Sequence, residues 1–213
     1  MSKVVINIPN ILSGARLLLV PVLLVLADQQ RETWFLVLLA VSLSTDAADG
    51  YLARKLNQTS ELGAKLDSWG DALTYGAMVV ALLWIWPDIF YREVWFVFTV
   101  MVCYLVPTAL GFLKFHELPS FHTWSAKASA VAMVPAYYIM VLFDESALFR
   151  LVVIFDIWVA LEAVFITVIL NRNRNNVPTV FHAREIMRRQ KARLKERHSQ
   201  LREKIAGKKN DGA

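Results

Sequence analysis

Six long apolar stretches between residues 11 and 170 are the feature that most limits how this chain can fold. Each has close to the roughly 20 mainly apolar residues that a helix needs to cross a bilayer. Hydrophobic residues make up 56% of the 213 and charged residues only 19%, which argues against a soluble globule. We predict six transmembrane helices, at about Ile11–Ala27, Trp34–Leu56, Gly63–Trp86, Val94–Leu113, Trp124–Phe143 and Leu148–Leu170.

The connections between these helices alternate in charge. The acidic ones follow the first, third and fifth helices, at Asp28/Glu32, Asp88/Glu93 and Asp144/Glu145. The basic ones contain Arg54, Lys55, Lys65, Lys114 and Lys127. Because Lys and Arg are enriched on the cytoplasmic side, we expect both termini to be cytoplasmic. The predicted class is an all-α, multi-pass protein of the inner (cytoplasmic) membrane.

Residues 171–213 differ from the membrane domain of residues 1–170. They contain 13 Lys and Arg against 4 Asp and Glu, and much of their sequence favours a helix. Such a basic cytoplasmic tail favours an anionic membrane surface as its partner, and we expect no nucleic acid. Met187, Leu194 and Leu201 recur every seven residues, which fits a surface helix or a coiled coil between subunits.

Four aspartates lie close together in residues 45–72, within or at the ends of the second and third helices. They are Asp46, Asp49, Asp67 and Asp71. An ionised residue at mid-bilayer costs roughly 2.5–3.5 kcal/mol on insertion scales, and four carboxylates would also repel one another. The group therefore needs cations, which means metal ions or a proton path.

The spacing places these acids on helix faces that can meet. Asp46 and Asp49 are three residues apart, while Asp67 and Asp71 are four apart. Carboxylate oxygens without His or Cys suit Mg²⁺ or Mn²⁺ better than zinc. Gly50 lets a ligand approach the backbone, and Arg54 can contact a phosphate with its forked guanidinium.

These residues form a pattern that resembles the CDP-alcohol phosphotransferase signature. The pattern D-x2-D-G-x2-A-R-x8-G-x3-D-x3-D is complete, at Asp46, Asp49, Gly50, Ala53, Arg54, Gly63, Asp67 and Asp71. The segment from Ile8 to Ser13, followed by Arg16, is also similar to the entry segment of that family. The motifs cover about the first 75 residues, and the rest resembles the family only in its six-helix layout.

The resemblance implies a function in phospholipid synthesis. A phosphatidyl group would pass from CDP-diacylglycerol to an alcohol, with release of CMP, in a homodimer whose active site faces the cytoplasm. The four aspartates would hold two divalent cations, Mg²⁺ or Mn²⁺, and Asp71 would also act as the base. The CDP part would be bound by Asp49, Gly50, Ala53, Arg54 and Gly63.

The two halves of the motif favour different alcohol acceptors. The front half, Thr45 to Gln58, resembles phosphatidylglycerophosphate synthases, which favours glycerol 3-phosphate. The back half departs from those enzymes, with Ser68 and Ala72 in place of Pro and Lys. Serine, inositol phosphate and phosphatidylglycerol, the last as in cardiolipin synthesis, are the alternatives.

A phosphate on the acceptor would need cations near the metal site. Lys114, His122 and Lys127 are candidates, although loop charges on the cytoplasmic side would look the same. Asp156 and Glu162 are further intramembrane acids. Glu162 would either line the site or pair with a basic residue such as Arg16.

Two functions of other classes are alternatives. A cation or proton transporter could use the same four carboxylates, but its polar residues should continue to the far side of the bilayer. A membrane scaffold acting through its tail would tolerate replacement of all four aspartates.

Overall fold

The computed structural model describes residues 8–55, 61–116 and 123–170, and in the tail residues 179, 180, 182, 184, 185, 187 and 188. Only the backbone is described for residues 8–13, 46–54, 61, 62, 64, 65, 67 and 68. The described part is helical almost throughout, which confirms the all-α class.

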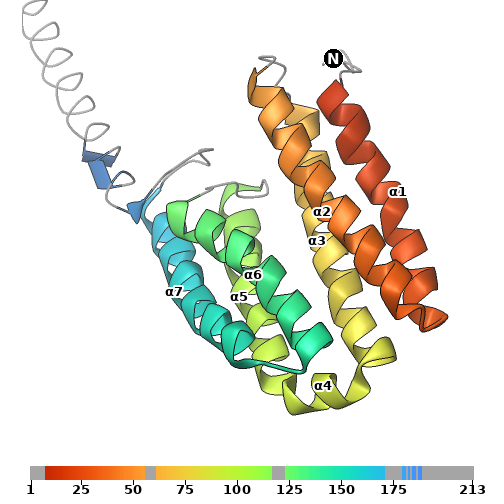
Figure 1. Cartoon of the computed structure of the whole chain (residues 1–213). Coiled ribbons are helices and arrows are strands. Elements are labelled where there is room, and N and C mark those ends of the chain that lie inside the picture. The colour runs from red at the N-terminus through yellow and green to blue at the C-terminus, as the bar shows by residue number, and fades with distance from the viewer. Residues whose placement is uncertain are drawn as a thin grey trace, which may run out of the picture. The chain divides into compact units, whose positions relative to one another are not determined.

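Seven α-helices make up the main described ranges (Figure 1). In chain order they are α1 (Ile8–Asp28), α2 (Glu32–Lys55), α3 (Glu61–Ile85), α4 (Pro87–Arg92), α5 (Val94–Phe115), α6 (Trp124–Phe143) and α7 (Ala147–Ile169). Each of the six predicted apolar segments corresponds to one of the long helices, with ends that differ by at most three residues.

The short helix α4 is the element that the sequence analysis treated as a connection. Pro87 occupies its first turn, where the missing backbone N–H is not needed and the fixed φ suits a helix. Asp88 in the first turn and Arg92 in the last turn also complement the helix dipole. Six residues are too few to show a hydropathy pattern, although these end signals are visible in the sequence.

Three helices in the described part are long and apolar enough to cross a membrane, namely α5, α6 and α7. Shorter apolar runs cover Glu32–Thr45 in α2 and Trp69–Ile85 in α3. The first run ends directly before Asp46. The second begins two residues after Asp67 and still contains Asp71, so the aspartates lie at the polar ends of both runs. The composition of the helices therefore supports a membrane protein with a polar segment built into α2 and α3.

The residues group into two compact units. The first comprises Met1–Phe98 with Ala136–Leu148, and the second comprises Thr99–Pro135 with Phe149–Ala213. The first unit therefore contains α1 to α4 and the end of α6. The second contains most of α5, the first part of α6 and most of α7.

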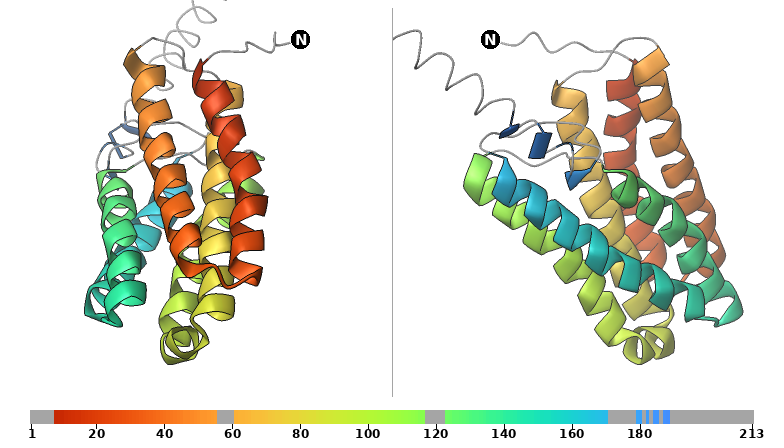
Figure 2. Two further views of the ribbon diagram at one scale, coloured as in Figure 1. Left: turned by 45° about the vertical axis from the view of Figure 1, so that its right-hand side comes forward. Right: turned by 90° about the vertical axis from the view of Figure 1, so that its left-hand side faces the viewer.

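In the first unit, α1 packs against both α2 and α3 (Figures 1 and 2). The buried side chains are mainly aliphatic, and Leu23 of α1 and Leu39 of α2 are completely buried. Their burial removes apolar surface from contact with polar groups and fixes the three helices against one another. This packing holds the motif-bearing ends of α2 and α3 in the same unit as α1.

The end of α6 is attached to this three-helix group by two tyrosines. The hydroxyl of Tyr138 donates a hydrogen bond to the carbonyl oxygen of Leu36 at 2.7 Å, and that of Tyr137 donates to Met78 at 3.2 Å. Trp86 lies edge-on to Tyr137, with ring centroids 6.4 Å apart. Each tyrosine thereby places its polar tip on a helix carbonyl and its ring in the apolar core.

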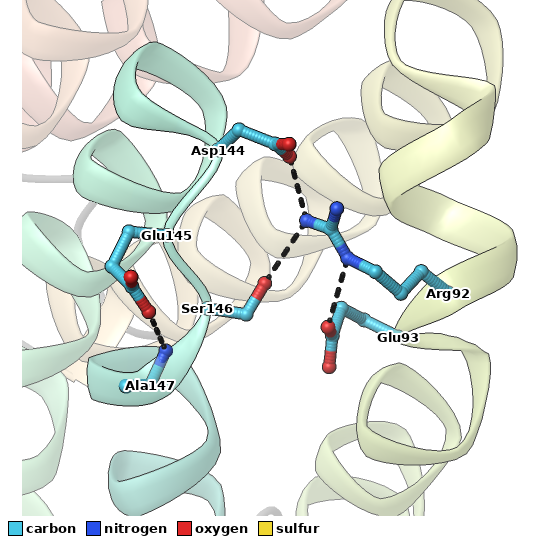
Figure 3. Close-up of polar contacts among 6 residues, drawn as sticks. All are labelled: Arg92, Glu93, Asp144, Glu145, Ser146 and Ala147. Atoms are coloured by element: carbon cyan, nitrogen blue, oxygen red, sulfur yellow. Dashed lines mark hydrogen bonds and ion pairs between the residues drawn. The ribbon is translucent and has the colours of Figure 1, made fainter.

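A polar cluster joins α4 to the connection between α6 and α7 (Figure 3). Arg92 donates one hydrogen bond to Asp144 at 2.7 Å and another to Ser146 at 3.2 Å. Its Nε also donates to Glu93, whose side chain is fully buried, at 3.2 Å. The hydrogen bond from Arg92 lowers the pKa of Asp144, and the same bond raises the pKa of Arg92.

In the second unit, hydrogen bonds between side chains join α6 to α7. Ser125 donates to Glu162, and Ser129 donates to Asp156 one turn further along α6. In the tail, Val180 and Met187 pack against the buried Ile166 and Leu170 at the end of α7. Two intramembrane acids thus have serine partners within their own unit.

Candidate functional site

The eight positions of the aspartate motif lie on helical backbone. Five are in the last turns of α2 and three are in the first turns of α3. The predicted helical spacing therefore holds, because residues three or four apart on a helix share a face. Of these eight residues, Gly63 and Asp71 are described beyond their backbone. The side chains of Asp46, Asp49, Gly50, Ala53, Arg54 and Asp67 lie outside the described residues.

Asp71, the proposed base, lies beside an arginine of α1. The Nη1 atom of Arg16 is 3.5 Å from Oδ1 of Asp71. The Arg16 side chain is only 2% exposed, whereas that of Asp71 is 43% exposed. The carboxylate is therefore in contact with a buried cation and still keeps a large open surface.

This contact differs from the pairing that the sequence analysis considered. For Glu162 two roles were left open, lining the site or pairing with a basic residue such as Arg16; among the described residues, Arg16 forms an ion pair with Asp71. Glu162 accepts a hydrogen bond from Ser125. A charged residue inside the first apolar segment was a visible signal of an interior partner, yet spacing along the chain could not identify which acid it meets.

Gly70 explains how Arg16 comes so close to α3. A β-carbon at Gly70 would lie 3.3 Å from Cδ and 3.4 Å from Nη1 of Arg16. The contact with Cδ would be tighter than ordinary van der Waals separation, so the arginine would have to give way by a few tenths of an ångström. At Gly76 of the same helix, a β-carbon would meet nothing within 4 Å.

Two buried hydroxyl groups lie one turn from motif aspartates along the helices. Ser42 precedes Asp46 by four residues, and Thr74 follows Asp71 by three. Both side chains are almost fully buried, and neither hydroxyl oxygen has a hydrogen-bond partner in the described part. An unsatisfied buried polar group costs about 1–3 kcal/mol, which a bound polar ligand or water would offset.

Of the three residues expected to bind the acceptor, Lys114 has the clearest contacts. Its Nζ donates to the carbonyl oxygens of Thr167 and Val168, both at 2.9 Å. These carbonyls belong to the last turn of α7, where helices carry unpaired acceptors and partial negative charge. The ammonium group of Lys127 lies 5.3 Å from the ring centroid of Trp124, and His122 is outside the described residues.

Comparison with known proteins places these features in a family. A family model described as CDP-alcohol phosphatidyltransferase matches residues 6–169. A protein named cardiolipin synthase (CMP-forming) from Streptomyces coelicolor is 33% identical over 153 residues, covering 67% of this chain and 68% of its own length. No solved structure matches the chain.

Two further relatives carry another name, CDP-diacylglycerol–glycerol-3-phosphate 3-phosphatidyltransferase. The one from Aquifex aeolicus is 40% identical over 65 residues, which is 30% of this chain and 36% of the relative. The one from Pseudomonas fluorescens is 35% identical over 80 residues, or 36% and 41% of the two chains.

The family match spans α1 to α7 and therefore includes the aspartate motif, Arg16 and the helices of both units. It confirms the resemblance that the motif indicated, and it extends the resemblance to residues that the motif does not reach. The chain is a membrane enzyme that belongs to the CDP-alcohol phosphatidyltransferase family.

Proposed function

We propose that this enzyme transfers a phosphatidyl group from CDP-diacylglycerol to an alcohol that carries a glycerol unit, with release of CMP. The observation that carries the proposal is the complete motif on the last turns of α2 and the first turns of α3, with the partly exposed carboxylate of Asp71 beside buried Arg16. A displacement at phosphorus needs a base near the acceptor hydroxyl and positive charge around the phosphates. The motif supplies residues for both needs.

The donor set fits two divalent cations. Asp46, Asp49, Asp67 and Asp71 offer only carboxylate oxygens, which hard ions such as Mg²⁺ and Mn²⁺ prefer. The buried, unsatisfied hydroxyls of Ser42 and Thr74 further indicate that the neighbourhood is suited to polar ligands. When bound, such cations would neutralise the phosphate oxygens and stabilise the attacking and leaving oxygens of the displacement.

The chain's own residues would carry out binding and proton transfer. Gly50, Ala53, Arg54 and Gly63, together with Asp49, would bind the CDP part. Asp71 would take the proton of the acceptor hydroxyl as the acceptor oxygen bonds to the phosphorus that carries diacylglycerol. The phosphoanhydride bond then breaks, and CMP leaves with the bonding electrons.

The membrane arrangement is part of the proposal. We assign α1, α2, α3, α5, α6 and α7 as six transmembrane helices, with both termini and the motif on the cytoplasmic side of the inner membrane. The alternation of acidic and basic connections supports this orientation. The working unit is a homodimer, as the family resemblance implies, and the basic tail of residues 171–213 faces anionic lipids.

Phosphatidylglycerol is the first candidate for the acceptor. The relative that matches over two thirds of both chains is named a cardiolipin synthase. Glycerol 3-phosphate is the second candidate, since the front half of the motif and the shorter matches favour it.

The test is CMP release by the purified full-length chain. CDP-diacylglycerol and Mg²⁺ or Mn²⁺ are supplied with one acceptor at a time: phosphatidylglycerol, glycerol 3-phosphate, serine or inositol phosphate. We expect CMP release that depends on phosphatidylglycerol, with cardiolipin as the lipid product. If only glycerol 3-phosphate supports CMP release, it replaces phosphatidylglycerol as the proposed acceptor. If none of the acceptors supports CMP release, the proposed reaction is overturned.

A further inference from the structure

Arg16 is an unusual residue for its position in the fold. It lies inside α1, among apolar residues, and its side chain is almost completely buried. A charged side chain within a membrane helix is costly and is normally found where a partner or a function retains it. None of the proposed catalytic roles uses Arg16, so its presence calls for an explanation.

The geometry of the contact with Asp71 suggests what Arg16 does. The guanidinium approaches one carboxylate oxygen, Oδ1, at 3.5 Å, while 43% of the Asp71 side chain remains exposed. A tight, two-pronged pair would occupy both oxygens and leave less room for other ligands. The observed contact instead holds the carboxylate at one oxygen, on a side chain that remains 43% exposed.

The backbone of α3 is adapted to this approach. Gly70 directly precedes Asp71, and any β-carbon there would press on Cδ of Arg16. Gly76, six residues further along α3, has open space around it and shows that glycine on this helix is not always a packing requirement. Arg16, Gly70 and Asp71 therefore form one local arrangement, in which the glycine provides the space for the arginine.

We propose that Arg16 is a positioning residue that sets the orientation of Asp71 for the transfer reaction, and that Gly70 is required for it to do so. The inference rests on the proposed function, because it takes Asp71 as the group that receives the acceptor proton. Arg16 acts through Asp71 and does not itself contact the substrate. Its fixed positive charge also offsets part of the negative charge of the four aspartates.

The first experiment compares two glycine substitutions on the same helix. Gly70→Ala displaces the Arg16 side chain, whereas Gly76→Ala places a methyl group in open space. Both changes raise helix propensity equally, so any difference in activity comes from the local contact. We expect Gly70→Ala to lower kcat by about tenfold at an unchanged KM for CDP-diacylglycerol, since small misplacements of reacting groups are costly. Gly76→Ala should match the wild type.

The second experiment changes the arginine itself. Arg16→Met should lower kcat more than Arg16→Lys, because lysine keeps the positive charge and loses only the planar set of guanidinium N–H donors. In the double variant Arg16→Ala/Gly70→Ala, the glycine change should add nothing to the effect of Arg16→Ala alone, because alanine has no atom at the δ position that the new β-carbon approaches. Thermal unfolding of each variant in detergent identifies any protein that has lost its fold.

A readout independent of catalysis is the stabilisation of each variant by Mn²⁺. We expect Arg16→Met and Gly70→Ala to reduce the rise in thermal midpoint on adding Mn²⁺, while Gly76→Ala keeps it. Folded Arg16→Met and Gly70→Ala proteins with wild-type kcat and Mn²⁺ response would overturn the inference, as would additive losses in the double variant. If the wild type releases no CMP, the proposed function fails, and the role of Arg16 is decided by the Mn²⁺ response alone.

Discussion

The chain holds acidic side chains inside its helices in two different ways. In the first unit, Asp71 lies beside the buried guanidinium of Arg16 and remains partly exposed. In the second unit, Glu162 and Asp156 of α7 accept hydrogen bonds from Ser125 and Ser129 of α6. A carboxylate that lies beside a cation and remains partly exposed can serve as a ligand or a base. A carboxyl group bonded to a hydroxyl on the next helix mainly connects the two helices.

This contrast sorts the intramembrane acids by their partners. All of them are functional candidates when only the sequence is considered, because any acid in an apolar segment is costly. Among the described acids, we expect the one with a charged partner and a partly exposed side chain to be reactive, and those with serine partners to be structural.

Removal of divalent cations should affect the first region alone. We expect a chelator to lower CMP release at least about a hundredfold, because the positive charge that stabilises the transition state is lost. Activity should return on adding Mg²⁺ or Mn²⁺. A Ser129→Ala protein should respond to chelation in the same way as the wild type. CMP release that persists in excess chelator would contradict the metal-dependent proposal.

Breaking one serine–acid pair should affect stability more than catalysis. Ser129→Ala removes the hydroxyl that bonds Asp156, and intramembrane hydrogen bonds of this kind contribute about 1 kcal/mol. We expect a fall of about 2–4 °C in the thermal midpoint for a chain of this size. Ser44→Ala, at an exposed serine of α2, is the control. A large loss of activity at unchanged stability would instead place this pair in the active site.

Lys114 tests whether a basic residue of the second unit binds the acceptor. Lys114→Met removes the ammonium group from the last carbonyls of α7, which should cost about 0.3–1 kcal/mol of stability. The KM for glycerol 3-phosphate and for phosphatidylglycerol should stay the same. Lys127→Met, which removes the cation above Trp124, is the comparison. A KM for glycerol 3-phosphate that rises only in Lys114→Met would restore Lys114 as an acceptor-binding residue.

The smallest effect concerns the exposed pair of Arg92 and Asp144. Because the hydrogen bond from Arg92 lowers the pKa of Asp144, the pair stabilises the fold above the unfolded-state pKa of about 4. This stabilisation is lost as pH falls through the lower pKa of the folded protein. Asp144→Asn, which suits the positive φ of 55° there, should therefore lower the thermal midpoint slightly at pH 7 but not in acid.

The pH series needs a matched acid as control. Asp28→Asn removes another exposed carboxylate, at the end of α1, without touching the Arg92 cluster. Thermal midpoints of the three proteins are measured in detergent between pH 7 and pH 3. A gap between wild type and Asp144→Asn that widens as the pH falls would contradict the sign of the predicted effect.

Much of the fold could be predicted from the sequence because hydropathy and loop charge are local properties. The fifth predicted segment has the same ends as α6, since Trp124 and Phe143 adjoin polar connections that interrupt the apolar run. The short helix α4 was missed because its stabilising signals, Pro87 and Asp88, lie at its start and no apolar pattern accompanies them.

In the candidate site, the sequence could likewise predict the local features, but it could not predict the contacts between residues far apart in the chain. The motif spacing predicts Asp71 as a site residue, because its relation to the other aspartates lies within two consecutive helices. The sequence could not show that Arg16 meets Asp71, since 55 residues separate them and only the packing of α1 on α3 brings them together. Gly70 lies outside the motif for the same reason, because its role depends on the arginine.

The most direct test of this account measures CMP release by Asp71→Asn and Glu162→Gln side by side, with CDP-diacylglycerol, Mn²⁺ and phosphatidylglycerol. Both changes replace a carboxylate by its amide and differ only in the region they affect. We predict that Asp71→Asn loses at least about a hundredfold in kcat, as expected for a general base, while Glu162→Gln keeps it within about threefold. Equal losses in both variants, or an active Asp71→Asn protein, would contradict the account.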